Sequence, residues 1–411
     1  MKRQKKLTGS IFSQILVWGG LDKPELSYTD MSHHAALQGV SITAQGLEQR
    51  FTPEAAEFMK ILLDEVVNQT ITTVTPRAIP VLQRFNGVYL RDSTVIRLPD
   101  ELQAIWPGCG GSAGGTAALK AQIRLNYTTG QLDGPVLQAG REHDRRTPYG
   151  PSDEPAGSLS LSDLGYFSLD ELGQRDAAGT YFITRYKHGT RLYTPEGEPL
   201  DLLAWLNGQN EPVLERQVLV GEKHRLPLRL IVFRVPQEIA DQRRRRLREY
   251  ARKKGVCPRK ETLALAEWTI LLTNVPETML NREEALDIMG VRWQVEILFR
   301  VWKSHALVDE WRSQNPWRIL CELYAKFIGQ IITHWLLLLG WHRFVDLSLW
   351  KAAKMVQKLV LPLALAMQRS EEEMEQIIAL LEQCFPACRQ NKRREDPATF
   401  QRLQALAESL S

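Results

Sequence analysis

The stretch from Met289 to Lys303, which reads MGVRWQVEILFRVWK, constrains the fold of this chain more than any other. Its apolar residues are too continuous to alternate as a half-buried strand, and we predict one helix that is buried over most of its circumference. At about 100° per residue, the side chains of Arg292, Glu296 and Lys303 fall within roughly 40° of one another on the helical wheel. The helix therefore carries one narrow charged stripe.

The carboxylate of Glu296 has two interpretations on such a helix. Removing a carboxylate from water is costly unless a cation accompanies it, and Arg292 lies one turn before it. A buried pair of Glu296 and Arg292 would then fix the packing of the helix. Alternatively, Glu296 helps to hold a divalent metal ion, while Arg292 and Lys303 face a polyanion. The second interpretation requires further carboxylates elsewhere in the chain.

The composition is that of a soluble globular protein large enough for two or three structural units. The 411 residues are 44% hydrophobic and 24% charged, with a net charge of +4 and a pI near 8.7. This charge is too small to establish a nucleic-acid partner by itself. The most apolar run, Ile331 to Leu339, contains His334 and falls short of the roughly 20 residues that cross a membrane. We expect it to be a core helix, and we expect no membrane association.

The cysteines indicate a reducing, cytoplasmic environment. They are odd in number and scattered, which makes a poor disulfide framework. Cys384 and Cys388 are spaced to share one face of a helix, but no histidine or further cysteine lies close in sequence to complete a zinc site. We therefore expect neither disulfides nor structural zinc.

Patterning predicts an α/β fold with five regions. A helix from Thr52, a suitable N-cap, to about Val67 belongs to the first region, and a long helix from Leu349 to Leu381 that is interrupted near Pro362 belongs to the last. A bundle that presents a helix to DNA and a compact packing domain both fit the first region. The regions are a helical N-terminal region at 1–80, the first half of a mixed-sheet core at 81–176, a β-rich insertion ending in a basic helix at 177–260, the second half of the core at 261–345, and a helical C-terminal region at 346–411.

Two aspartates mark the ends of predicted strands. The segment from Gln83 to Leu98 reads as a strand, a polar break that begins at Asp92, and a second strand, so Asp92 lies at a junction. The segment that begins at Leu159 reads as a short apolar strand that ends at Asp163. Mixed sheets commonly place their chemistry at the carboxyl ends of strands.

A dense run of basic residues follows the strands of the predicted insertion. Arg243, Arg244, Arg245 and Arg246 begin a basic stretch that extends to Lys260, largely on a predicted helix. Such a block is usually solvated surface, yet its density also suits contacts with phosphate groups. Both interpretations stay open on the sequence alone.

Carboxylates from Asp92, Asp163 and Glu296 that converged on one point would repel one another unless cations lay between them. Paired divalent metal ions about 3.5 to 4 Å apart are the arrangement used for in-line phosphoryl transfer. One ion then activates the attacking oxygen, and the other stabilises the leaving oxygen. The acids therefore predict phosphoryl-transfer chemistry, provided that the fold brings them together.

These motifs resemble those of bacterial insertion-sequence transposases of the DDE class. The likeness is to the branch with the Tyr-Arg-Glu-Lys (YREK) signature, of the insertion-sequence family four type, in which two, three and six residues separate the four positions. Arg292, Glu296 and Lys303 fit these spacings. The resemblance covers roughly residues 83–341. Its other parts are the phrases LRDSTVI around Asp92, LSDLGYF around Asp163 and LLTNVP from Leu271 to Pro276, which occur in the expected order.

The resemblance implies a ribonuclease-H-like core and cut-and-paste movement of an element, by hydrolysis at its ends and strand transfer into target DNA. It implies Mg²⁺ or Mn²⁺ as the cofactor, with two ions, held by Asp92, Asp163 and Glu296. Arg292 and Lys303 carry over by motif position as contacts to the DNA backbone. The implied partners are double-stranded DNA with the element's terminal inverted repeats, target DNA, and a second copy of the chain in a synaptic homodimer, all at the nucleoid of a prokaryotic cytoplasm.

Trp205 and Met289 occupy positions that matter for base stacking and for the family signature, respectively. In relatives a tryptophan of the insertion stacks on a displaced base during hairpin formation, and Trp205 is the only tryptophan in the predicted insertion. Met289 stands at the tyrosine position of the signature, and a methionine cannot hydrogen-bond a phosphate as a phenol does. The start is also short of a long amino-terminal region. A catalytically silent DNA-binding protein derived from a transposase, and a structure-specific nuclease on the same core, therefore remain as alternatives.

Overall fold

The computed structural model describes residues 7–69, 75–110, 115–395 and 397–408. Contacts between Cα atoms group the chain into two compact units. Each unit combines segments that lie far apart in sequence. The first contains Met1–Ile79, Asp92–Pro148 and Trp293–Gln401, and the second contains Pro80–Arg91, Tyr149–Arg292 and Arg402–Ser411.

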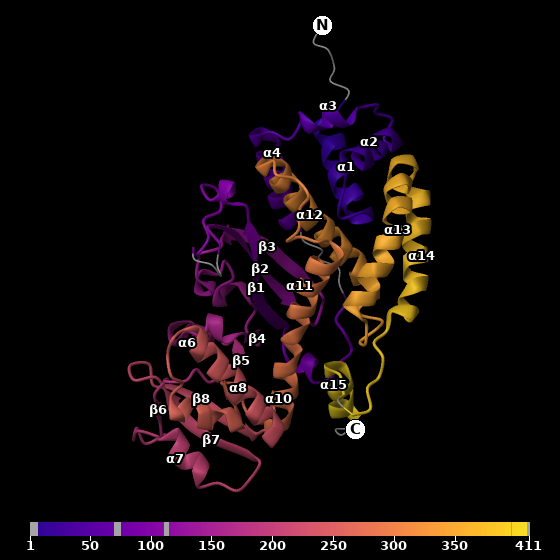
Figure 1. Ribbon diagram of the computed structural model, residues 1–411. Coiled ribbons are helices and arrows are strands. Elements are labelled where there is room, and N and C mark those ends of the chain that lie inside the picture. Colours follow the sequence, from indigo (N-terminus) through magenta and orange to yellow (C-terminus); the bar gives the residue numbers. More distant parts are fainter. Residues whose placement is uncertain (1–6, 70–74, 111–114, 396, 409–411) are drawn as a thin grey trace. The chain divides into compact units, whose positions relative to one another are not determined.

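Helices make up most of the first unit (Figure 1). The 26-residue helix α12 is the longest of those described, and α1, α4 and α13 all pack against it. Helices α13 and α14 lie side by side. The helices of this unit are α1 (Gly9–Asp22), α2 (Tyr28–Leu37), α3 (Ala44–Glu48), α4 (Pro53–Val67), α11 (Trp293–His305), α12 (Pro316–Trp341), α13 (Leu349–Arg369) and α14 (Glu371–Cys384).

The predicted helix from Thr52 to Val67 is confirmed as α4. The hydroxyl oxygen of Thr52 accepts a hydrogen bond from the backbone N–H of Ala55 at 3.3 Å. Pro53 occupies the first helical position, where no N–H is needed, and Glu54 places a negative charge in the first turn. Local chemistry therefore determines where this helix begins.

The predicted interruption near Pro362 is wrong. Helix α13 continues from Leu349 to Arg369 with Pro362 inside it. A proline in a helix interior costs about 3 kcal/mol, and the apolar face that α13 buries offsets this cost. The chain breaks instead at Ser370, whose backbone is extended and whose hydroxyl accepts the N–H of Glu373 at 3.1 Å to cap α14.

Helix α12 is long and apolar enough to cross a membrane by length and composition alone. The helix runs from Pro316 to Trp341, so it is longer than the expected run from Ile331 to Leu339. Within the molecule, 78% of its apolar window is buried. The burial confirms the expected core helix, and a helix of this kind is weak evidence for a membrane span.

The described strands form one mixed sheet with the order β3-β2-β1-β4-β5-β9-β8-β7-β6. The pairs β1 with β4 and β4 with β5 are parallel, whereas β5 with β9, β9 with β8, β8 with β7, β7 with β6, and β2 with β3 are antiparallel. The predicted α/β fold with a mixed sheet is thus confirmed. The strands are β1 (Val88–Leu98), β2 (Ala117–Asn126), β3 (Leu132–Ala139), β4 (Leu159–Ser162), β5 (Tyr181–Arg185), β6 (Leu192–Tyr193), β7 (Val213–Val220), β8 (Leu226–Arg234) and β9 (Trp268–Thr273).

The predicted break in β1 at Asp92 is wrong. The strand is continuous over Val88–Leu98, and Leu90, Thr94 and Ile96 are buried on the same face, so the period of two passes through Asp92. Asp92 therefore lies within a strand rather than at a junction between two strands.

Strand β2 of the first unit is buried along almost its whole length. Ala121, Ile123 and Leu125 are buried on one face of the strand, and Lys120 and Gln122 are buried on the other. Helices α4 and α12 pack against the neighbouring strand β3. The side chain of Lys120 is therefore buried within β2 and its neighbours.

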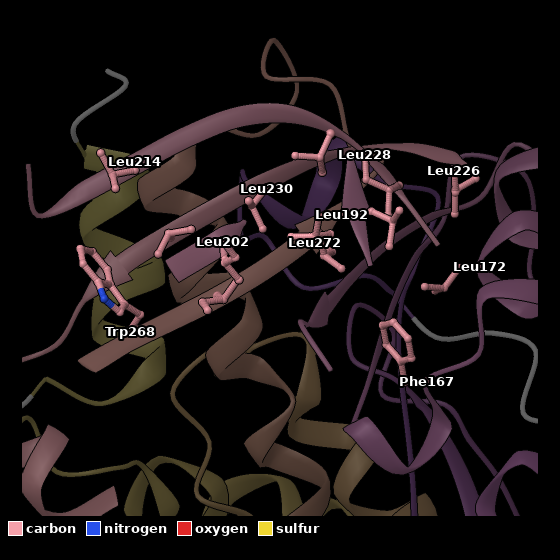
Figure 2. Packing of buried hydrophobic residues seen from close by; sticks show 14 of the residues in the cluster. Phe167, Leu172, Leu192, Leu202, Leu214, Leu226, Leu228, Leu230, Trp268 and Leu272 are labelled. Atoms are coloured by element: carbon pink, nitrogen blue, oxygen red, sulfur yellow. The ribbon is translucent and has the colours of Figure 1, made fainter. Parts of the chain in front are cut away.

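The apolar core of the second unit lies on strands β5 to β9 and on the helices beside them. Figure 2 shows Leu228 and Leu230 of β8, Leu272 of β9, and Phe167 among its members. Removal of such side chains from water is the main favourable contribution to folding. The helices with residues in this unit are α6 (Leu169–Ala177), α7 (Leu202–Asn207), α8 (Gln237–Lys253), α9 (Lys260–Ala264), α10 (Arg282–Val291) and α15 (Thr399–Glu408).

The predicted β-rich insertion does not form a sheet of its own. Strand β8 of the insertion pairs with β9 of the predicted core, from Arg229 opposite Thr273 to Arg234 opposite Trp268. Both strands are almost entirely buried, so each gains apolar contacts and backbone hydrogen bonds from the other. The insertion therefore extends the sheet of the core.

Candidate active site

The parallel pairing of β1 with β4 ends immediately before two aspartates. Within the second unit, the register partners end with Arg91 opposite Ser162. The residue after Arg91 is Asp92, and the residue after Ser162 is Asp163. Because parallel strands run in one direction, both acids follow the same end of this ladder.

The side chain of Asp163 is exposed at the carboxyl end of β4, where the sequence predicted it. A single 3-10 turn, Leu164–Tyr166, follows it, and the carbonyl oxygen of Asp163 accepts the N–H of Tyr166 at 3.0 Å. Within the described part of the chain, the carboxylate makes no capping hydrogen bond to this turn. Among the described residues, the turn is thus closed by the backbone of Asp163 and not capped by its carboxylate.

A buried charge network in the second unit holds Arg91 of β1, and sequence reasoning missed it. Arg175 donates to both carboxylate oxygens of Glu154, at 2.7 and 3.2 Å. Glu171 accepts hydrogen bonds from Arg175 at 3.1 Å and from Arg91 at 2.5 Å. Burial lowers the pKa of Arg91, and the positive charge of Arg175 contributes to the same effect. The sequence does contain one sign of this network, because Arg91 is a charged residue inside an apolar strand, directly before Asp92.

Asp92 is half-buried in the first unit, next to a second polar network. Its Oδ1 accepts the backbone N–H of Ser93 at 2.8 Å. The hydroxyl of Ser93 donates to Oδ1 of Asp144 at 3.0 Å, and Nζ of Lys120 donates to the same oxygen at 2.7 Å. Sequence reasoning assigned no role to Ser93, Lys120 or Asp144.

The prediction of one helix from Met289 to Lys303 is wrong. Helix α10 ends at Val291, and α11 begins at Trp293. Arg292 between them keeps right-handed helical angles, φ −50° and ψ −32°. The residue two positions earlier is Gly290, and glycine is a poor helix former that weakens a continuous helix at this point.

The residues of the predicted charged stripe therefore lie on different elements. Arg292, which is 8% exposed, ends α10 in the second unit. Glu296 is half-buried in the first turn of α11, and Lys303 lies in its last turn in the first unit. Nζ of Lys303 is 3.9 Å from Oδ2 of Asp309, which is a weak, partly exposed ion pair. Met289, at the tyrosine position of the signature, is buried in α10.

The predicted basic helix is confirmed as α8, but two of its arginines serve the fold. Arg243 donates to the carbonyl oxygen of Trp268 at 3.0 Å and to the hydroxyl of Thr269 at 2.9 Å. Burial lowers the pKa of Arg243. Arg244 forms an ion pair with Glu267. Both side chains are half-buried, so they tie α8 to β9 and to the residue before it.

The remaining basic side chains of α8 face solvent. Arg245 and Arg246 are exposed, as are Arg248, Arg252 and Lys253 further along the helix. These side chains form a dense positive surface, the kind of surface that phosphate groups attract.

Trp205 lies in α7 of the second unit and is half-buried. Its ring packs against the apolar core of that unit, and the guanidinium carbon of Arg216 lies 5.4 Å from the ring centroid. Packing alone is a sufficient reason for a tryptophan at this position.

The carboxylates of the predicted site have the chemistry of a divalent-metal site. Within the described residues, no group of three or more His, Cys, Asp or Glu side chains is arranged to hold a metal ion. Asp92 and Glu296 belong to the first unit and Asp163 to the second. Carboxylate oxygens are the ligands that Mg²⁺ and Mn²⁺ prefer, and the exposed carboxylate of Asp163 is not used for capping. The three side chains are therefore of the chemical type that binds such an ion.

The sequence matches the family model of the transposase DDE domain over residues 83–330, more than half of the chain. The transposase for insertion sequence element IS231B of Bacillus thuringiensis subsp. berliner is 27% identical over 93% of this chain and 85% of its own length. The transposase for IS231F of Bacillus thuringiensis subsp. israelensis is 28% identical over 96% of this chain and 87% of its own length. The transposase for IS1151 of Clostridium perfringens is 27% identical over 70% of this chain and 65% of its own length.

The matched residues include strands β1 to β9 and end within α12, so the family match contains the whole described sheet. It also contains Asp92, Asp163 and Glu296. Proteins with a DDE domain in general depend on a divalent metal ion and act on DNA. The chain therefore belongs to the DDE-domain transposases of insertion sequences, and it is an enzyme whose partner is DNA.

Proposed function

We propose that this transposase moves its insertion sequence by a cut-and-paste route, in which hydrolysis at the ends of the element precedes strand transfer into target DNA. The observation that carries the proposal is the pairing of Arg91 with Ser162, because each of these residues is followed directly by a carboxylate. Asp92 and Asp163 thus follow one end of a parallel ladder, a position where mixed sheets support catalytic side chains.

Asp92, Asp163 and Glu296 are the residues that would hold the metal, and we propose Mg²⁺ or Mn²⁺ with two ions. Such ions supply charge stabilisation at the phosphoryl oxygens and a hydroxide-like nucleophile at neutral pH. The exposed carboxylate of Asp163 is accessible without disruption of its turn. Glu296 lies in the first turn of α11, on the half-buried part of the helix.

Arg292 and Lys303 are proposed contacts to the DNA backbone near the cleaved end. The weak, partly exposed pair of Lys303 with Asp309 leaves its ammonium able to exchange that partner for a phosphate. Met289 is buried, so this position adds packing where the signature has a phenol. We place the chain in the YREK branch on the spacing of Arg292, Glu296 and Lys303.

The outward face of α8 is a proposed second DNA surface. Arg245 and Arg246 are its best candidates for phosphate contacts because both are exposed. Arg243 and Arg244 contribute positive charge there while they hold α8 to the sheet. Trp205 is proposed as a stacking platform for a displaced base, a role that would require it to leave part of its present packing.

We further propose that the enzyme works as a homodimer that brings together the two terminal inverted repeats of its element before it engages target DNA. The proposed setting is the nucleoid in the cytoplasm of a prokaryotic cell. Such a dimer would present the positive surfaces of both copies to the two DNA ends. Binding of one end would then raise the effective concentration of the other end and increase the affinity for it.

The test uses the full chain and DNA cloned from both flanks of the gene that encodes it, because the ends of an insertion sequence lie there. We expect cleavage at both flanks in the presence of Mg²⁺, followed by joined products when target plasmid is added. Asp163→Asn should bind the same DNA without cutting it.

Two results would replace the proposal. Binding of the flanks without any cut by the unaltered chain would identify a silent DNA-binding protein. Cutting of branched DNA that does not depend on the flanks, and without joined products, would identify a structure-specific nuclease.

A further inference from the structure

A continuous polar chain in the first unit leads from the interior of β2 to the carboxylate of Asp92. Lys120 in β2 is 6% exposed, and its Nζ lies 2.5 Å from the carbonyl oxygen of Glu142 and 2.7 Å from Oδ1 of Asp144. The hydroxyl of Ser93 donates to that same oxygen at 3.0 Å. The backbone N–H of Ser93 then donates to Oδ1 of Asp92 at 2.8 Å.

The enclosed ammonium of Lys120 is costly for the fold. Desolvation of a buried charge costs several kcal/mol in proteins, and a well-packed apolar side chain would avoid this cost. The strand around it is buried almost throughout, so an apolar residue would suit the position. A charge at this position therefore suggests a role beyond packing.

Asp144 connects the buried charge to the strand that carries the acid. It lies in the segment after β3, its side chain is 31% exposed, and one of its oxygens accepts both Lys120 and Ser93. Two donors on one oxygen fix the position of the Ser93 hydroxyl, and the N–H of Ser93 orients the carboxylate of Asp92. Partners of this kind fix the orientation of metal-binding carboxylates in other metal sites.

We propose that Lys120 and Asp144 are positioning residues that act through Ser93 to hold the carboxylate of Asp92 ready for a divalent cation. This inference rests on the proposed role of Asp92 as a metal ligand. Loss of the hydrogen bonds that join Lys120, Asp144 and Ser93 would leave the folded protein and its DNA affinity intact. It would weaken cation binding by about 10- to 100-fold.

Ser93→Ala is the sharpest test because it removes one hydroxyl from a half-exposed position and leaves both charges in place. Asp144→Asn keeps an acceptor for Ser93 and removes the charge that faces Lys120. The measurement is Mn²⁺ affinity of the full chain, from the paramagnetic resonance signal of free Mn²⁺, together with thermal unfolding in the absence of metal. We expect both variants to bind Mn²⁺ about 10- to 100-fold more weakly while Ser93→Ala unfolds at the wild-type temperature.

Thr116→Ala is the matched control, since it removes a hydroxyl that donates to the carboxylate of Asp100 in the same unit but outside the chain that leads to Asp92. Its Mn²⁺ affinity should equal that of the wild type. Lys120→Met completes the series, and Ser93→Ala decides the question if the lysine variant does not fold.

Asp92→Asn separates the two ways in which the inference can fail. Suppose that Ser93→Ala and Asp144→Asn bind Mn²⁺ like the wild type, whereas Asp92→Asn loses affinity. This result would overturn the positioning role and leave Asp92 as a metal ligand. Wild-type affinity in Asp92→Asn would overturn the assignment of Asp92 as a ligand, and the positioning role with it.

Discussion

The guanidinium of Arg175 holds the carboxylate of Glu154 at two points, 2.7 and 3.2 Å, and both side chains are sealed from solvent. Removal of one partner of such a pair leaves the other charge buried and uncompensated, at a cost of about 3–5 kcal/mol. We expect Arg175→Met to lower the free energy of unfolding by about this amount in a urea titration followed by tryptophan fluorescence.

The double variant Arg175→Met/Glu154→Met shows whether the unpaired charge is the cause. Because both charges leave together, the double variant should be more stable than Arg175→Met alone. A loss equal to the sum of the two single losses would mean that packing, and not the ion pair, determines stability at this position.

Asp163→Asn should reduce cleavage of flank DNA by about a thousandfold or more, which corresponds to about 4 kcal/mol of activation free energy. The amide keeps the shape of the side chain but removes the charge that a cation requires. Thermal stability and DNA affinity should be unchanged, because the carboxylate is exposed and not used for capping among the described residues. Asp170→Asn, an exposed acid of α6 in the same unit, should cleave like the wild type.

The two faces of the basic helix should respond differently to salt. Arg245→Ala/Arg246→Ala should flatten the plot of log affinity against log salt by about 0.9 for each phosphate group that the variant no longer neutralises, measured between roughly 50 and 200 mM salt. Arg243→Ala should change the salt slope less than the double variant does. It should instead lower thermal stability, because it loses two hydrogen bonds to β9. An unchanged slope in the double variant would remove this face of α8 from the DNA surface.

His334 makes the stability of the fold depend on pH. Its Nε2 lies 2.6 Å from the carbonyl oxygen of Gly130 and so carries the hydrogen, whereas its Nδ1 has no partner among the described residues. Burial lowers the pKa of His334 from 6.5 to about 4. Between these values the unfolded chain binds a proton that the folded chain does not. The stabilisation is therefore full above pH 6.5, and about 3 kcal/mol of it is lost as the pH falls to 4.

His334→Gln keeps a donor for Gly130 and cannot titrate. Between pH 7 and pH 5, its free energy of unfolding should fall by about 2 kcal/mol less than that of the wild type, measured by urea titration at each pH. Equal losses in the two proteins would assign the pH dependence to other groups.

Short-range features of this fold could be predicted from the sequence because neighbouring residues decide them. The cap at Thr52, the end of β4 at Asp163 and the helical basic run are confirmed. The same kind of reasoning failed at Pro362, where the buried face of α13 outweighs a local penalty. The predicted strand break at Asp92 was also wrong. Buried residues before and after the polar pair Asp92 and Ser93 keep β1 continuous.

The networks behind the candidate site could not be predicted, since they join residues that are distant in sequence. Arg91 and Glu171 are 80 positions apart, and Ser93 and Asp144 are 51 apart. No periodic pattern links such positions. The sequence phrases around Asp92 and Asp163 made these acids candidates, whereas their hydrogen-bonded neighbours depend on how the strands and loops fold back.

Strand β9 is hydrogen-bonded on one side to β5 and on the other to β8. A version of this chain without residues 187–265 would keep β5 and β9 but lose β8. One edge of β9, which contains the apolar residues Ile270 and Leu272, would then be unpaired. An apolar strand with an open edge recruits strands from other molecules and aggregates. We therefore expect β8 to protect β9 from self-association, and shortened forms of this transposase that lack β8 should become insoluble.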